Sequence, residues 1–230
     1  MILRSRVSEN FVLRMSTLDL YEPWSFVCGP GLPPRTGDRV VAFTQKRLEV
    51  LNAAAAEAGA PVLDAEVLDP LKFPSVLSLE TLEGNPTYYA TKDPSTLPED
   101  LQSLAKAVEE ADAFIVCCPE YNHTIPPALT AMMNMIGCSK YANKVSGSIC
   151  YSGFPSPAGG ARCAVALRPF LSELGCLPVS KQVIIPNAPG QLSEAGEPEG
   201  EHASGCVKQM DGMLEQLRWW AEACRTQRNK

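Results

Sequence analysis

A polar loop carries the side chains of this chain that are best suited to chemistry or ligand binding: Glu120, Tyr121, Asn122, His123 and Thr124. It follows residues 113–118, an almost uninterrupted apolar run that predicts a strand buried on both faces of a parallel sheet. Pro126 and Pro127 then predict the start of a helix, because proline is tolerated in a first turn and an apolar helical pattern follows. We therefore expect the loop at the carboxyl end of a strand, where open α/β sheets bind ligands.

The side chains of this loop allow alternatives to ligand binding. His123 can instead orient the loop by hydrogen bonding, and Glu120 can accept hydrogen bonds from its own turn. Asn122 is a common turn residue that tolerates left-handed geometry. A cysteine–histidine hydrolase built on Cys118 and His123 is a further alternative, but its nucleophile must be exposed and close to a base. Cys118 closes a buried strand, and the sequence identifies no third orienting group, so we expect Cys117 and Cys118 to pack in the core.

A second loop, residues 29–39, has the features of an anion site. It lies between a predicted first strand at 24–28 and a helix predicted from about 38 to 58. Backbone N–H groups and the helix dipole both favour negative charge at such a position. The alternative is a proline-stiffened turn capped by Asp38, whose carboxylate would compete with an anion for the same donors.

The remaining pattern alternates strands and helices. Further strands are predicted at 61–68, 145–151 and 177–185, with helices at 98–111, 161–174 and 205–225. Residues 152–160 form a loop of small residues, and residues 186–205 a loop with little buried apolar surface. This alternation predicts a doubly wound α/β domain. We expect a flavodoxin-like three-layer α/β/α sandwich with a five-stranded parallel sheet in the order 2-1-3-4-5, which gathers the loops after strands one, three and four at one edge.

Three motifs carry a family resemblance. From Asp112 the chain reads Asp-Ala, a run of apolar residues, and then Pro-Glu-Tyr-Asn-His-x-Ile-Pro-x-x-Leu. This stretch resembles the flavin-contacting strand, loop and helix of the NADPH-dependent FMN reductase family. The second loop resembles the family's phosphate loop, with Pro30 where the family has serine and Leu32 where it often has arginine. The loop at residues 152–160 resembles the family's motif Ser-x-Gly-x-x-Gly-Gly-x-Arg. The resemblance extends from about residue 26 to residue 186.

The resemblance implies FMN as cofactor and NADPH or NADH as co-substrate. The implied FMN-binding residues are Gly29, Gly31, Arg35, Thr36 and Gly37 for the phosphate, and Pro119, Glu120, Tyr121, Asn122, His123, Ser152, Gly153, Gly159 and Gly160 around the ring. It also implies a ping-pong mechanism, in which NAD(P)H and an acceptor such as a quinone or free flavin use one slot in turn, and a homodimer or homotetramer. No catalytic side chain is implied, because the cofactor carries the chemistry. The alternative is a non-catalytic FMN-binding or redox-sensing scaffold.

Composition narrows the partners and the compartment. A net charge of -6 argues against nucleic acid or an anionic membrane as the main partner, and no apolar run reaches the roughly 18 residues that span a bilayer. The nine cysteines include no C-x-x-C motif, so we expect free thiols, no metal site and a reducing, cytoplasmic location. Residues 1–22 are predicted to be a poorly ordered N-terminal extension of a single domain, residues 23–230.

Overall fold

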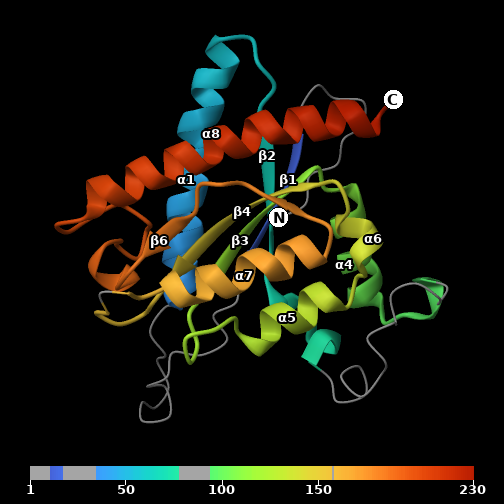
Figure 1. Ribbon diagram of the computed structural model, residues 1–230, viewed down its shortest axis with the longest axis horizontal. Helices are drawn as coiled ribbons and strands as arrows, with labels where there is room; N and C mark the ends of the chain where they lie inside the picture. Colours follow the sequence, from blue (N-terminus) through green and yellow to red (C-terminus); the bar gives the residue numbers. More distant parts are fainter. Residues whose placement is uncertain (1–10, 18–34, 78–93, 157) are drawn as a thin grey trace.

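The computed structural model describes residues 11–17, 35–77, 94–156 and 158–230 of the chain (Figure 1). Its strands are β1 (Phe11–Thr17), β2 (Leu63–Leu68), β3 (Ala113–Pro119), β4 (Val145–Tyr151), β5 (Leu177–Pro178) and β6 (Val183–Ile185). They form a parallel sheet in the order β2-β1-β3-β4-β5, and β6 also pairs with β4. The prediction of an α/β fold with a parallel sheet is confirmed.

Helices cover both faces of this sheet. They are α1 (Thr36–Glu57), α4 (Glu99–Glu110), α5 (Pro127–Asn134), α6 (Cys138–Tyr141), α7 (Ala161–Glu173) and α8 (Ala203–Arg228), with single 3₁₀ turns at Pro70–Lys72, Pro74–Leu77, Pro94–Thr96 and Ala188–Gly190. Their positions follow the predicted apolar periods closely, and α5 begins at Pro127 as its proline pair indicates. In Figure 1, α8 crosses α1, while α5 and α7 lie together away from that pair.

The core has two halves because side chains alternate along the central strands. On β3, Phe114, Val116 and Cys118 pack with residues of α4, α5 and α7, whereas Ile115 and Cys117 pack with α1 and α8. Every residue of β3 and β4 is buried, as expected for strands with a helix layer on each face. The sandwich therefore holds the ends of β3 and β4 rigidly, and these ends carry the loops of interest.

The start of the chain differs from the prediction. Residues 11–17 form β1, which lies between β2 and β3, so it was wrong to assign them to a poorly ordered extension. Arg14 interrupts the apolar residues of this segment, which is why it was not recognised as a strand. The strand predicted at 24–28 lies outside the described residues, as do residues 1–10 and 18–22.

The predicted fifth strand is divided into β5 and β6, so the sheet has six strands instead of five. Between the two strands, the chain turns to α8: Gln216 accepts a hydrogen bond from the Lys181 N–H at 3.0 Å and pairs with the Ser180 hydroxyl. These bonds replace ladder bonds to β4.

The segment after β6 is more closely packed than predicted. Ala188 and Leu192 are fully buried, and Arg39 of α1 donates to the Leu192 carbonyl at 2.9 Å. Gly196 lies so close to α1 that a Cβ on it would come within 2.3 Å of the Phe43 nitrogen. Ala188 and Leu192 are the only buried apolar side chains at 186–205, so the prediction of little buried apolar surface is confirmed, but these two side chains suffice to anchor the segment.

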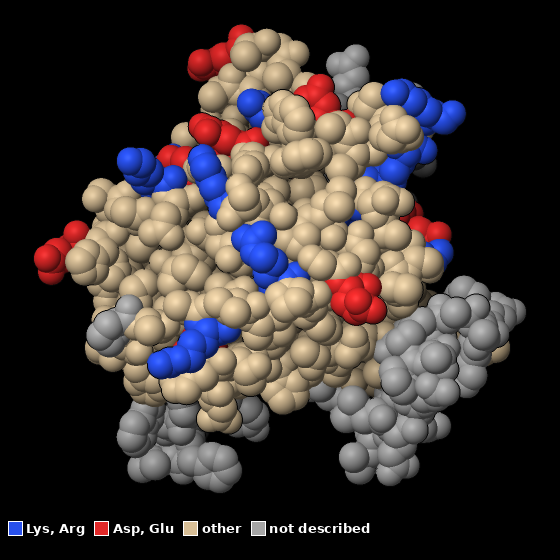
Figure 2. Space-filling model, viewed as in Figure 1, with Lys and Arg blue, Asp and Glu red and all other residues tan. Residues whose placement is uncertain are grey.

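The exposed face in Figure 2 shows acidic and basic side chains interspersed, with no block of one sign. Among the described residues, no helix combines the length and the apolar character that crossing a membrane requires. Eight free cysteines are described, of which Cys138 is exposed, and no cluster of His, Cys, Asp and Glu in this part of the chain has the geometry of a metal site.

The packing of α8 yields a stability prediction. Leu217 is fully buried against the α1 side of the sheet, whereas Trp219, two residues along, is 62% exposed. Leu217→Ala should lower the free energy of unfolding by about 2–5 kcal/mol, the usual cost of a large-to-small change in a packed core. Trp219→Ala should cost less than about 1.5 kcal/mol, since it loses mainly its edge-on contact with Trp220. Urea unfolding of both variants makes the comparison, and equal losses would contradict it.

Candidate functional site

The loops after β3 and β4 line one cavity of about 490 Å³ at the carboxyl edge of the sheet. Its lining residues are Glu120, Tyr121, Asn122, His123, Ser152, Phe154, Ser156 and Gly159. Six of these were predicted from the sequence. Phe154 and Ser156 were missed, although an aromatic residue within a small-residue loop at a strand end was a usable signal. A larger hollow, about 770 Å³, lies against α8 but contains none of the predicted residues.

The loop after β3 is a two-residue hairpin. The Tyr121 N–H donates to the Thr124 carbonyl at 3.1 Å, and the Thr124 N–H donates back at 2.9 Å. Between them, Asn122 has φ 50° and His123 has φ 63°. Positive φ at both central residues defines a type I′ turn, which asparagine and histidine tolerate better than most residues. The turn leaves the N–H groups of Asn122 and His123 without a hydrogen-bond partner among the described residues.

Glu120 anchors this hairpin to α7. Its side chain is only 6% exposed. One carboxylate oxygen accepts from the backbone N–H groups of Arg162 and Cys163, at 3.0 and 3.1 Å, in the first turn of α7. Burial tends to raise the pKa of Glu120, but hydrogen bonds from His123, Cys163 and Arg162 outweigh burial and lower the pKa. The alternative that Glu120 satisfies backbone donors is therefore correct, but the donors belong to α7 and not to its own turn.

His123 links the cavity to a positive charge. Its Nδ1 lies 3.0 Å from the second carboxylate oxygen of Glu120 and 3.0 Å from Nη1 of Arg162. A protonated Nδ1 donates to Glu120, whereas an unprotonated Nδ1 accepts from Arg162, so the ring can serve only one partner at a time. The histidine side chain is 65% exposed. It thus both orients the loop and faces solvent at the cavity.

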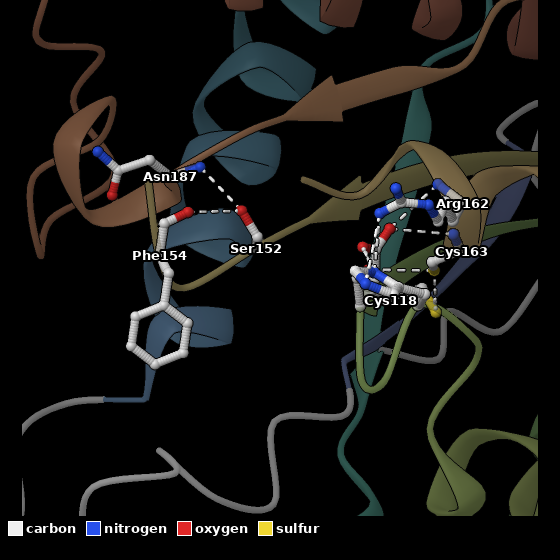
Figure 3. Close-up of polar contacts among 8 residues, drawn as sticks. Cys118, Ser152, Phe154, Arg162, Cys163 and Asn187 are labelled. Atoms are coloured by element: carbon white, nitrogen blue, oxygen red, sulfur yellow. Dashed lines mark hydrogen bonds and ion pairs between the residues drawn. The ribbon is translucent and has the colours of Figure 1, made fainter. Parts of the chain in front are cut away.

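Small residues shape the other side of the cavity. The Ser152 hydroxyl donates to the Phe154 carbonyl at 2.9 Å and accepts from the Asn187 N–H at 3.0 Å (Figure 3). A Cβ on Gly159 would come within 2.1 Å of that hydroxyl oxygen. Gly160 has φ 87°, and a Cβ there would come within 2.6 Å of the Cys150 carbonyl oxygen. Both positions thus require glycine, and the backbone can approach a ligand closely.

The start of α1 lies near this loop. A Cβ on Gly153 would be 3.7 Å from the Thr36 hydroxyl oxygen, so two predicted residues from distant parts of the chain are neighbours. Thr36 and Gly37 are buried in the first turn of α1. Asp38 does not cap the helix with its side chain, contrary to the alternative considered above. Gly29 and Gly31 lie outside the described residues.

Arg35 is held by two carboxylates. Its guanidinium donates to Asp69, after β2, at 2.7 and 3.2 Å, and to Asp38 at 2.8 and 3.4 Å. These bonds use four of its five N–H donors. The hydrogen bond from Arg35 and the N–H of Leu71 lower the pKa of Asp69 although burial tends to raise it, and the hydrogen bond to Asp69 raises the pKa of Arg35. One N–H remains for an anion unless the aspartates release the side chain.

Comparison with known proteins assigns the family. Residues 39–190 match the model of the NADPH-dependent FMN reductase family, which is well over half of the chain. The chain belongs to this family. The family's description names FMN and NADPH, so FMN is the implied cofactor and NADPH or NADH the implied reductant.

Individual relatives are distant. The NADH:(hydroxy)cinnamate reductase subunit CrdA of Vibrio ruber is 25% identical over 129 residues, which are 55% of this chain and 63% of that protein. The chain thus matches less than two thirds of the length of this curated relative. A solved oxidoreductase from Corynebacterium diphtheriae has a TM-score of 0.65 at 12% identity, covering 94% of this chain and 99% of that one. FerB, the NAD(P)H:(acceptor) flavoenzyme of Paracoccus denitrificans, has a TM-score of 0.57 at 14% identity, covering 90% and 96%. These likenesses show the flavodoxin-like fold.

The residues around the cavity fit the flavin ring of FMN chemically. The ring is planar and offers carbonyl oxygens and ring nitrogens as acceptors, which suit the unpaired N–H groups of Asn122 and His123. Tyr121 and Phe154 supply aromatic surface, and Phe154 is 43% exposed. The donor set and the apolar surface therefore match what a flavin requires.

The buried carboxylate of Glu120 yields a prediction with a defined pH dependence. Glu120→Gln should lower the free energy of unfolding at pH 7 by about 1.5–3 kcal/mol, because it removes a charged acceptor from two N–H donors. The pKa of the folded state lies below the ordinary value of 4.5, so the stabilisation is present above 4.5 and is lost as pH falls through the folded pKa. The difference in the free energy of unfolding between the natural sequence and Glu120→Gln should therefore shrink on acidification.

Urea titrations between neutral and acidic pH measure this gap. Glu109→Gln is the matched control, since Glu109 is 60% exposed and pairs with Lys140 on the surface. That control should cost no more than about 1 kcal/mol. Equal effects of the two changes would show that the contact with α7 contributes little.

Proposed function

We propose that this protein passes electrons from NAD(P)H through FMN to a quinone, a free flavin or a similar small acceptor by a ping-pong mechanism. FMN, when bound, accepts a hydride from the nicotinamide and returns the electrons to the acceptor. The observation that carries the proposal is the convergence of the loops after β3 and β4 on one cavity, with unpaired backbone donors and aromatic side chains at its wall. Its open mouth suits two substrates that enter in turn.

The protein's own residues have binding and orienting roles in this proposal. The backbone from Pro119 to His123 would border one edge of the flavin ring, and Ser152, Gly153, Gly159 and Gly160 would border the other. Arg35, Thr36 and Gly37 would hold the phosphate at the start of α1, where the helix dipole favours an anion, and Gly29 and Gly31 are the further residues proposed to bind it. Glu120 is already engaged by α7 and is not a proton-transfer group.

Arg162 suggests a feature of the acceptor. Within the described residues its guanidinium forms no ion pair with a carboxylate, and it lies 3.0 Å from Nδ1 of His123, which lines the cavity. A positive charge next to aromatic surface favours a planar acceptor with an anionic substituent. The name of the Vibrio ruber relative, a reductase subunit for (hydroxy)cinnamate, an aromatic acid, is consistent with such an acceptor.

The alternative is a non-catalytic FMN-binding or redox-sensing scaffold. The contacts of Arg35 favour the scaffold, because the guanidinium predicted to bind the phosphate already forms ion pairs with two aspartates. A scaffold would bind FMN without turning over NAD(P)H. For either function we propose a cytoplasmic homodimer or homotetramer, with the oligomeric state measurable by light scattering.

Turnover separates the two functions. The purified protein should show flavin absorbance and should oxidise NADPH or NADH when menadione is added as the quinone. Tyr121→Ala should lower kcat at least tenfold, about 1.4 kcal/mol in barrier, and shift the flavin spectrum, since it removes aromatic surface from the cavity wall. Tyr121→Phe is the control and should retain most of the activity. FMN binding without NAD(P)H oxidation would favour the scaffold.

The phosphate role of Arg35 needs a paired experiment. Arg35→Ala should weaken FMN binding by roughly 1.5–3 kcal/mol, or about ten- to 150-fold in Kd, the scale of a charge-assisted hydrogen bond. This change also breaks the contact with Asp69, so Asp69→Asn is the control: it breaks the same contact but keeps the cation. Asp69→Asn should bind FMN at least as tightly as the natural sequence. Fluorescence titration gives both constants, and equal weakening in the two variants would assign Arg35 a purely structural role.

A further inference from the structure

Two buried thiols meet directly beneath the hairpin of the candidate site. The sulfur atoms of Cys118 and Cys163 lie 3.1 Å apart, and both side chains are fully buried (Figure 3). Cys118 is near the end of β3, and Cys163 is in the first turn of α7. A third thiol, that of Cys150, lies opposite Cys118 in the β3–β4 register. Neither electron transfer through FMN nor the packing of the core requires three thiols at this point.

The surroundings make one of the thiols the better nucleophile. Burial raises the pKa of the Cys118 thiol, whereas hydrogen bonds with Cys118 and Cys150 lower the pKa of Cys163 despite its burial and the nearby Glu120 carboxylate. Cys163 also lies at a helix N-terminus, which favours a thiolate. Proton loss is therefore favoured at Cys163, whose sulfur lies 3.1 Å from that of Cys118.

We propose that Cys118 and Cys163 are a redox-active pair that a hydroperoxide converts into a disulfide joining β3 to α7. In the first step, the Cys163 thiolate attacks a peroxide oxygen, the O–O bond breaks, and a sulfenic acid forms; the leaving hydroxide or alkoxide takes up the proton that Cys163 released and departs as water or alcohol. In the second step, the Cys118 sulfur attacks the Cys163 sulfur, the S–O bond breaks, and water leaves. The two sulfurs together lose two electrons, and the hydroperoxide gains them.

The geometry favours this pair over any pair with Cys117. Cys117 is next to Cys118 in sequence but packs on the opposite face of the sheet, with α1 and α8. The Glu120 side chain, one residue after β3, already accepts a hydrogen bond from the Cys163 N–H at 3.1 Å, so closing the sulfur gap needs only a small shift. The disulfide would fix that junction covalently. This inference does not depend on the proposed function.

Burial limits the rate at which a hydroperoxide oxidises Cys118 and Cys163. Both sulfurs are shielded from solvent, so a hydroperoxide reaches them only when the start of α7 opens locally. Cys138, which is exposed, should react earlier with any thiol reagent. The Cys138→Ser variant therefore provides a suitable background, because it removes the thiol best placed to link two molecules.

The test is disulfide mapping of the full-length protein. The Cys138→Ser protein is treated with hydrogen peroxide, denatured in the presence of N-ethylmaleimide to block free thiols, and digested. Tandem mass spectrometry then locates any linked peptides. We expect loss of two free thiols and a single main link between Cys118 and Cys163. A thermal melt should show a higher unfolding temperature after oxidation, reversed by dithiothreitol, because the link restricts the unfolded chain.

Matched variants decide the assignment. Cys163→Ser and Cys118→Ser should each abolish the link, whereas Cys117→Ser and Cys150→Ser should leave it intact; circular dichroism checks that each variant is folded. Should a serine variant fail to fold, the mapping of the Cys138→Ser protein alone still decides. A main link between Cys118 and Cys150, or oxidation to sulfinic acid with no intramolecular link, would overturn the proposal.

Discussion

The candidate site depends on one buried carboxylate. Glu120 extends from the end of β3 across the sheet edge and accepts the first N–H groups of α7, which no earlier turn of that helix could satisfy. A charge that is 94% removed from solvent is tolerated only when such donors surround it. By meeting this requirement, the sequence brings the hairpin of β3 and the glycine turn before α7 into a fixed relation. The cavity exists because these two loops cannot separate without leaving the carboxylate unpaired.

A second polar contact positions the start of α1 at the carboxyl edge of the sheet. Arg35, just before α1, is joined to Asp69, just after β2, so the start of α1 is tied to the neighbouring strand. Asp38 adds a second acceptor from within the helix. This arrangement uses a positive charge for structure where the family resemblance implies its use for ligand binding. The two uses compete for the same guanidinium, so ligand affinity at this end is coupled to local packing.

The sequence predicted those features that rest on local pattern. The buried runs of β3 and β4, the proline start of α5 and the polar loop between them required only hydrophobic periodicity and proline chemistry, and all are present. Features set by tertiary contacts were not predictable. The strand at 11–17 is stabilised by pairing with two distant strands, and Gln216 diverts the chain between β5 and β6 from a helix far along the sequence.

The same division holds for the candidate site. Glu120 and His123 were identified by residue type and position, but the partner of Glu120 could not be, because α7 begins about forty residues later and nothing in the sequence fixes its distance. Phe154 was missed because a single aromatic residue in a loop has many possible roles. The contacts of Arg35 were missed because Asp69 read only as the end of a strand.

The two halves of the core are completed at different stages of synthesis. The half beneath α4, α5 and α7 is complete once residue 176 has been made, since Cys176 is its last buried member among the described residues. The other half needs α1 from near the beginning of the chain and α8 from its end. On the ribosome, one face of the sheet therefore keeps its apolar side chains uncovered until α8 emerges. Because α8 is made after every described strand of the sheet, its packing against α1 belongs to a late stage of cotranslational folding.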